Sequence, residues 1–130
     1  TKELNLQQHV QILDFSKEVD VFYSEADIFA FTSLYEGFPN SLIEAMAHGL
    51  PCVSYDCPTG PADIIKNGVN GVLVNLSDKK QFQEKLNNLM DSENLRKAFS
   101  IEAKNVKEKY SLKIITDKYL NFILKDEINY

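Results

Sequence analysis

The chain has 130 residues, 44% hydrophobic and 25% charged, which is typical of one folded domain and not of a disordered or fibrous protein. Its net charge of −5 argues against a nucleic-acid partner, because nucleic-acid-binding proteins use basic surfaces. The two cysteines, Cys52 and Cys57, form no CxxC pair and no cluster at zinc-ligand spacing. No apolar run reaches the ~18 residues of a membrane span.

Along the chain, strand patterns alternate with helix patterns. Short runs rich in branched and aromatic residues predict strands at 9–15, 27–33, 51–56 and 70–76. The segments between them predict helices at 17–26, 41–48 and 62–68. The run at 27–33 is apolar nearly throughout, as in strands that are covered on both faces. We therefore expect an α/β fold with a mainly parallel sheet.

Beyond residue 77 the strand patterns stop, and apolar residues recur at helical spacing. We expect three helical stripes to face the core: Phe82, Leu86, Leu89 and Met90; Leu95, Phe99, Ala103, Val106 and Tyr110; and Leu112, Ile115, Tyr119, Phe122 and Ile123. The chain is thus predicted to be a single domain over residues 1–130 that ends in helices.

The stretch SLYEGFPNSLIEAMAHGLP, residues 33–51, follows a predicted strand and starts a predicted helix. Ligands of parallel sheets bind beyond the carboxyl ends of the strands, where this stretch would lie. Its two glutamates allow two interpretations. In one, Ser41 and Glu44 form a capping box, S-x-x-E, and Glu36 is a solvated loop acid. In the other, Gly37 lets the backbone approach a phosphate at the helix N-terminus, and Glu36 and Glu44 bind hydroxyl groups on either side of it, as a sugar nucleotide requires.

The ordered run from residue 33 to 74 resembles a known family. It reads E-G-F, then L-x-E-A-M-A-x-G-x-P, then a glycine-bearing turn, then N-G-x-L-V. This pattern is similar to the donor-binding half of the family-4, or group 1, retaining glycosyltransferases, and the resemblance extends from about His9 to Ser111. It implies the GT-B architecture, in which the donor lies between two Rossmann-like domains. The expected fold is then a Rossmann-like parallel sheet with helices on both faces, part of a C-terminal domain.

The resemblance also implies a set of donor-binding residues: Glu36, Gly37, Phe38, Asn40, Ser41, Leu42 and Glu44. Glu36 would bind the sugar hydroxyls as the catalytic residue, without acting as a nucleophile, and Glu44 would bind the ribose. The backbone N–H groups of residues 37, 38 and 40 would contact the sugar and the distal phosphate. Those of residues 41 and 42 would hold the diphosphate.

The turn CPTGP, residues 57–61, follows the next predicted strand. Thr59 and Gly60 precede a helix, so their N–H groups either reach the ligand or form a simple turn. The turn is similar to that of relatives that add hexose or N-acetylhexosamine units to polysaccharides or lipid-linked glycans.

By resemblance, the reaction is retaining transfer from a nucleotide sugar, UDP-linked, to a glycan or lipid-linked acceptor, with no metal and no other cofactor. The family's acceptor domain and a strand with an arginine and a lysine are not recognisable here. We therefore expect an N-terminally truncated and inactive piece, which self-associates through an exposed sheet edge. The full enzyme is expected in the cytoplasm at the inner face of the plasma membrane, as a peripheral membrane protein. A sugar-nucleotide epimerase or glycosyl phosphorylase of similar architecture, or a non-catalytic interaction module, is the alternative.

Overall fold

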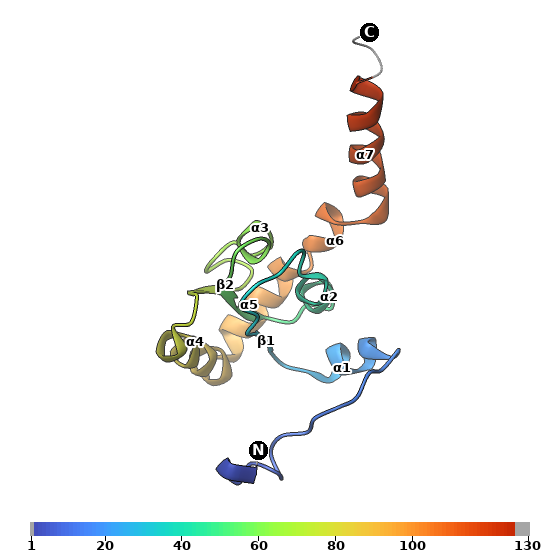
Figure 1. Cartoon of the computed structure of the whole chain (residues 1–130). Helices are drawn as coiled ribbons and strands as arrows, with labels where there is room; N and C mark the ends of the chain where they lie inside the picture. The colour runs from blue at the N-terminus through green and yellow to red at the C-terminus, as the bar shows by residue number, and fades with distance from the viewer. Residues whose placement is uncertain (1, 127–130) are drawn as a thin grey trace.

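The computed structural model describes residues 2–126, and Figure 1 shows a central body from which the N-terminal segment and the last helix project. The elements in chain order are the 3₁₀ helix η1 (Lys2–Leu4), α1 (Val19–Glu25), β1 (Phe29–Phe31), α2 (Asn40–Ala47), β2 (Cys52–Asp56), α3 (Pro61–Ile64), β3 (Val72–Asn75), α4 (Lys79–Asp91), α5 (Glu93–Ala103), α6 (Val106–Lys109) and α7 (Leu112–Asp126).

The sheet has the order β1-β2-β3, and both pairs of strands are parallel. Phe29 lies opposite Cys52, and Val53 lies opposite Val72. The helices α2 and α3 lie in the connections between consecutive strands, as parallel pairing requires. The predicted α/β fold is therefore confirmed.

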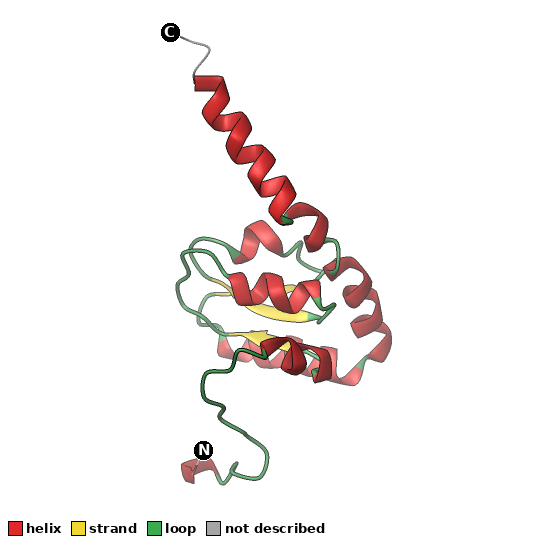
Figure 2. Cartoon of the chain, turned by 90° about the vertical axis from the view of Figure 1, so that its right-hand side faces the viewer, coloured by secondary structure: helices red, strands yellow, loops and turns green. Residues whose placement is uncertain are grey.

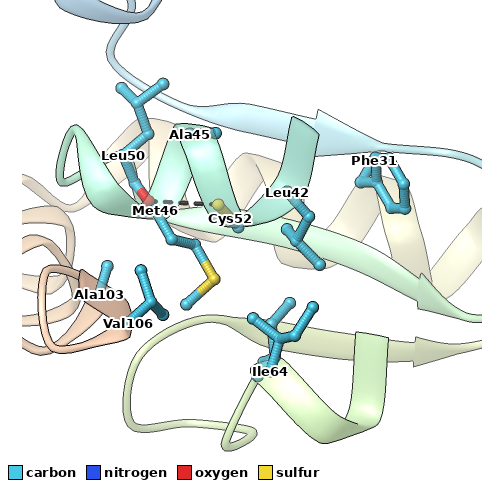
Figure 3. Packing of buried hydrophobic residues seen from close by; sticks show 10 residues of the cluster. Phe31, Leu42, Ala45, Met46, Leu50, Cys52, Ile64, Ala103 and Val106 are labelled. Carbon is cyan, nitrogen blue, oxygen red and sulfur yellow. Dashed lines mark hydrogen bonds between the residues drawn. The ribbon is translucent and has the colours of Figure 1, made fainter. Parts of the chain in front are cut away.

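Helices cover both faces of the sheet, and Figure 2 shows the strands lying between them. Successive residues of β2 point to opposite faces, so Cys52 and Val53 belong to different clusters of buried side chains. One cluster joins the sheet to α2, α3, the end of α5 and the start of α6: Phe31, Leu42, Ala45, Met46, Leu50, Cys52, Ile64, Ile65, Ala103 and Val106. Figure 3 shows this cluster and labels all of these residues except Ile65. The other joins it to α4 and α5: Val53, Tyr55, Val72, Val74, Phe82, Leu89 and Phe99.

The predicted strand at 9–15 is wrong. Residues 10–16 have no regular secondary structure, and Ile12 and Phe15 are 82% and 90% exposed. A strand forms only where its backbone groups pair with a neighbour, and β1 pairs with β2 alone among the strands that the structure describes. The β-forming composition of this segment therefore has no sheet to join.

Two of the three helical stripes face the core as predicted. Phe82, Leu89 and Phe99 are buried, although Met90 at the edge of the first stripe is exposed. The prediction for the third stripe is wrong, because the apolar residues of α7 are exposed along the helix. Figure 1 shows α7 leaving the body. Helical periodicity identifies an apolar face but not what covers that face.

The raised pKa values of the two thiols should make the stability of the chain depend on pH. Burial raises the pKa of Cys52 above its ordinary value of 9.0, and burial, helped by the Glu36 carboxylate, raises that of Cys57. The unfolded chain thus loses these protons at a lower pH than the folded chain. The free energy of unfolding should be unaffected below pH 8 and should fall above pH 9, by up to ~1.4 kcal/mol per pH unit from Cys52 and by less from Cys57, whose pKa shift is smaller.

Urea unfolding at pH 7.5 and pH 10 measures this effect, with Cys52→Ala as the comparison. The variant should lose less of its own stability between the two pH values than the unaltered chain loses. Equal losses would show that the Cys52 proton does not contribute.

Candidate functional site

The loops that follow β1 and β2 meet at one edge of the sheet. Because the two strands are parallel, their carboxyl ends lie at the same edge. The hydroxyl of Thr59 donates a hydrogen bond to the carbonyl oxygen of Glu36. Gly60 packs on the ring of Pro39, so closely that a Cβ atom at residue 60 would lie 2.4 Å from Pro39 Cδ. The two segments that sequence reasoning singled out, 33–42 and 57–61, therefore form one surface.

Helix α2 begins at this edge, with Pro39 as its N-cap residue. The predicted capping box is wrong, because the helix begins one residue earlier than expected and no side chain caps it. Ser41 consequently lies inside the first turn. The carbonyl oxygen of Pro39 accepts from the N–H groups of Leu42 (3.1 Å) and Ile43 (3.3 Å). Glu44 therefore does not cap the helix, as the first of the two interpretations required.

The first turn of α2 and the loop before it leave backbone donors unpaired. Within residues 2–126 we find no acceptor for the N–H groups of Gly37, Phe38 and Ser41. The N–H of Asn40 donates to the carbonyl of Phe38 (2.9 Å), and that of Leu42 is also paired. Three free donors beside a helix N-terminus can bind an anion.

The two glutamates lie in different environments. Glu36 is half-buried, and its carboxylate is close enough to help raise the pKa of the Cys57 thiol. Glu44 is exposed on α2, and its Oε2 accepts a hydrogen bond from the hydroxyl of Tyr23 (3.3 Å). Burial, with the Glu44 carboxylate as the next cause, raises the pKa of Tyr23. Sequence reasoning missed Tyr23, because Tyr23 and Glu44 are 21 positions apart and no local pattern indicates their contact.

The remaining predicted residues differ in what they can offer a ligand. Phe38 is half-exposed, and its ring lies edge-on to Tyr110, with ring centroids 5.9 Å apart. Leu42 is fully buried in the core, so only its backbone reaches this edge of the sheet. The hydroxyl of Thr59 is already bonded to a carbonyl oxygen, and Gly60 is covered by Pro39. Their roles in donor binding stay predictions.

The candidate site is an open surface. A hollow of about 720 Å³ lies instead near the amino ends of β1 and β2, between Tyr23, His48, Pro51 and Arg96, and residues 36–44 do not line it. Residues 2–126 include no group of three or more His, Cys, Asp or Glu side chains arranged to hold a metal ion. None of the helices described here is both long and apolar enough to span a membrane.

Comparison with known proteins finds glycosyltransferases that are similar to this chain. A glycosyltransferase of amylovoran biosynthesis from Erwinia amylovora, AmsD, is 37% identical over 118 residues, which are 91% of this chain and 33% of that protein. A lipopolysaccharide 1,6-galactosyltransferase from Salmonella typhimurium is 47% identical over 62 residues, 48% of this chain and 17% of that protein. The crystal structure of a mutant of S. aureus TarM, in complex with fondaparinux, α-GlcNAc-glycerol and UDP, is 30% identical. It superposes with a TM-score of 0.87 over 92% of this chain and 24% of that one.

The chain spans a third or less of the length of these three proteins. The structural match confirms the Rossmann-like sheet as part of a larger glycosyltransferase fold. The family model described as glycosyl transferases group 1 matches residues 1–106, which include both strand-end loops. This chain belongs to the group 1 glycosyltransferases.

Proposed function

We propose that this chain binds the sugar-nucleotide donor of a retaining glycosyltransferase. The enzyme transfers a hexose or N-acetylhexosamine from a UDP-sugar to a glycan or lipid-linked acceptor in polysaccharide or glycan synthesis. The observation that carries this proposal is the surface at the carboxyl ends of β1 and β2, where three free N–H groups lie between two glutamates. The TarM complex with UDP supports the choice of nucleotide.

The diphosphate would bind to the backbone. The N–H groups of Gly37, Phe38 and Ser41 have no acceptor among the described residues, 2–126. The N-terminus of α2 carries the positive end of the helix dipole. Breaking the glycosidic bond leaves negative charge on the departing diphosphate. Donors fixed in place before the reaction stabilise that charge without having to reorganise, and this is the main catalytic contribution that the chain can make.

The two glutamates would bind the hydroxyl-rich ends of the donor. An ionised carboxylate only accepts hydrogen bonds, and it accepts them strongly from paired hydroxyl groups. Glu36 would hold the transferred sugar, in a loop that Thr59 fixes through the Glu36 carbonyl. Glu44, one turn into α2, would hold the ribose. Glu36 then orients the sugar and does not attack it.

The rest of the reaction depends on parts of the enzyme outside this chain. The acceptor would bind mainly there, and any attachment of the enzyme to the inner face of a membrane would lie there too. The proposed mechanism needs no metal ion, since backbone donors take the charge of the diphosphate. This chain alone is therefore proposed to bind the donor without transferring its sugar.

Calorimetric titration of UDP into the folded chain tests the donor site. Glu44→Ala should weaken UDP binding about ten- to a hundredfold, because hydrogen bonds to a charged group contribute about 1.5–3 kcal/mol. Glu84→Ala is the matched control and should bind UDP normally, because Glu84 lies on α4, outside the candidate site, where its carboxylate pairs with Lys85.

Equal UDP affinity of Glu44→Ala and the unaltered chain would contradict the ribose role. If circular dichroism shows a folded chain that binds no UDP, the same titration of the full-length enzyme is decisive. If the full-length enzyme binds UDP, residues outside this chain are needed for affinity. If the full-length enzyme does not bind UDP, the proposed donor site is refuted. Binding of UDP by this chain would also separate the proposal from a non-catalytic interaction module.

A further inference from the structure

Helix α1 is attached to the body mainly through one aromatic residue. None of its residues is fully buried, and Tyr23 is its member that packs against the core. The ring of Tyr23 lies edge-on to Phe29 of β1, with centroids 6.0 Å apart, and beside His48 at the end of α2, at 5.3 Å. These contacts fix the ring and therefore the direction of its hydroxyl.

The hydroxyl of Tyr23 points to the part of α2 that carries the candidate site. It lies 3.3 Å from Oε2 of Glu44 and 3.4 Å from the carbonyl oxygen of Ser41. Within residues 2–126, it is the donor that contacts the Glu44 carboxylate. Glu44 is otherwise exposed, and an exposed glutamate must give up side-chain freedom before it can hold a ligand.

A second contact joins the same two helices. Nε2 of His48 lies 3.4 Å from the carboxylate of Asp20 on α1, and Nδ1 of His48 lies 2.9 Å from the carbonyl oxygen of Glu44. Helix α1 therefore holds α2 both in its first turn and at its end. Along the chain, Glu44 lies between Ser41 and His48, the residues of α2 and its C-cap at which the other contacts are made.

We infer that Tyr23 is a positioning residue for Glu44. Its hydroxyl holds one carboxylate oxygen and leaves the remaining acceptor sites of the carboxylate free for a pair of ribose hydroxyls. The inference rests on the proposed function of Glu44, and it adds a residue outside the strand-end loops to the donor site. Helix α1 thus contributes to nucleotide affinity through the Glu44 carboxylate.

Tyr23→Phe tests this role, because phenylalanine keeps the ring packing and removes only the hydroxyl. UDP and 2′-deoxy-UDP are titrated into both forms of the chain. UDP binding should weaken about three- to tenfold, as expected for the loss of one hydrogen bond, and 2′-deoxy-UDP binding should weaken less. Tyr119→Phe is the control, because Tyr119 lies on α7, outside the candidate site, and is 67% exposed. The UDP affinity of this variant should not change.

Three outcomes of these titrations would overturn the inference. If Tyr23→Phe weakens both ligands equally, the hydroxyl supports the fold and does not position the ribose ligand. If UDP affinity is unchanged in Tyr23→Phe but reduced in Glu44→Ala, Glu44 binds ribose without help from Tyr23. Unchanged UDP affinity in Glu44→Ala would instead refute the proposed role of Glu44, and the positioning role with it.

A titration without ligand tests the contact itself. Burial and then the Glu44 carboxylate raise the pKa of Tyr23 above 10.0, with a smaller contribution from Asp20. In a chain with ¹³Cζ-labelled tyrosine, Glu44→Gln should therefore lower the Tyr23 pKa more than Asp20→Asn does. If Glu44→Gln leaves the Tyr23 pKa unchanged, the two side chains are not in contact in solution and the inference fails.

Discussion

Replacement of Leu42 by alanine should lower the free energy of unfolding by about 3 kcal/mol, the loss typical of a fully buried leucine. Leu42 has no exposed surface and packs beside Met46 and Ile64 (Figure 3). The substitution removes apolar contacts and leaves a cavity that the surrounding helices close only in part. Urea unfolding followed by circular dichroism measures the change.

Leu34→Ala is the matched control for this experiment. Leu34 lies in the same strand-end segment but is 61% exposed, so its removal should cost less than about 0.5 kcal/mol. Leu42 belongs to the predicted donor site only through its backbone, whose N–H is already paired with Pro39. UDP affinity of the folded fraction should therefore stay unchanged in Leu42→Ala. Equal stability losses in the two variants would show that α2 does not pack as described.

The parts of the fold that could be predicted are those whose signal is local. The apolar run at 27–33 contains β1, and the helix expected at 41–48 is α2 displaced by one residue. Such elements are marked by their own composition and by the residues that end them. The predictions of a strand at 9–15 and of a core-facing α7 were wrong, because a segment does not itself encode which strand pairs with it or what covers its apolar face.

The candidate site, like the fold, could be predicted only where its signal is local. The spacing of Glu36, Gly37 and Glu44 is local, and the sequence pattern is enough to place all three around one turn. The hydrogen bond from Thr59 to the Glu36 carbonyl joins residues 23 positions apart, and the contact of Tyr23 with Glu44 joins residues 21 apart. These contacts depend on how the strands pair, so only the folded structure reveals them.

Replacement of Gly60 by alanine is expected to cost about 3 kcal/mol of folding stability, from backbone strain and overpacking together. The φ angle of Gly60 is +120°, which L-residues rarely adopt. An added Cβ would also lie 2.4 Å from Cδ of Pro39, and the buried proline ring cannot rotate away. Either the helix start at Pro39 or the turn before α3 must then move.

Gly68→Ala separates the two causes. Gly68 has a φ of +76°, but nothing lies within 4 Å of where its Cβ would be, so it should lose only about 1 kcal/mol through strain. The larger loss in Gly60→Ala then measures the contact between the two strand-end loops. Because that contact holds the loop with the free N–H groups, Gly60→Ala should also weaken UDP binding, whereas Gly68→Ala should not. Equal losses of stability in the two variants would mean that the loops do not support each other, and that the first loop keeps its shape through the helix start alone.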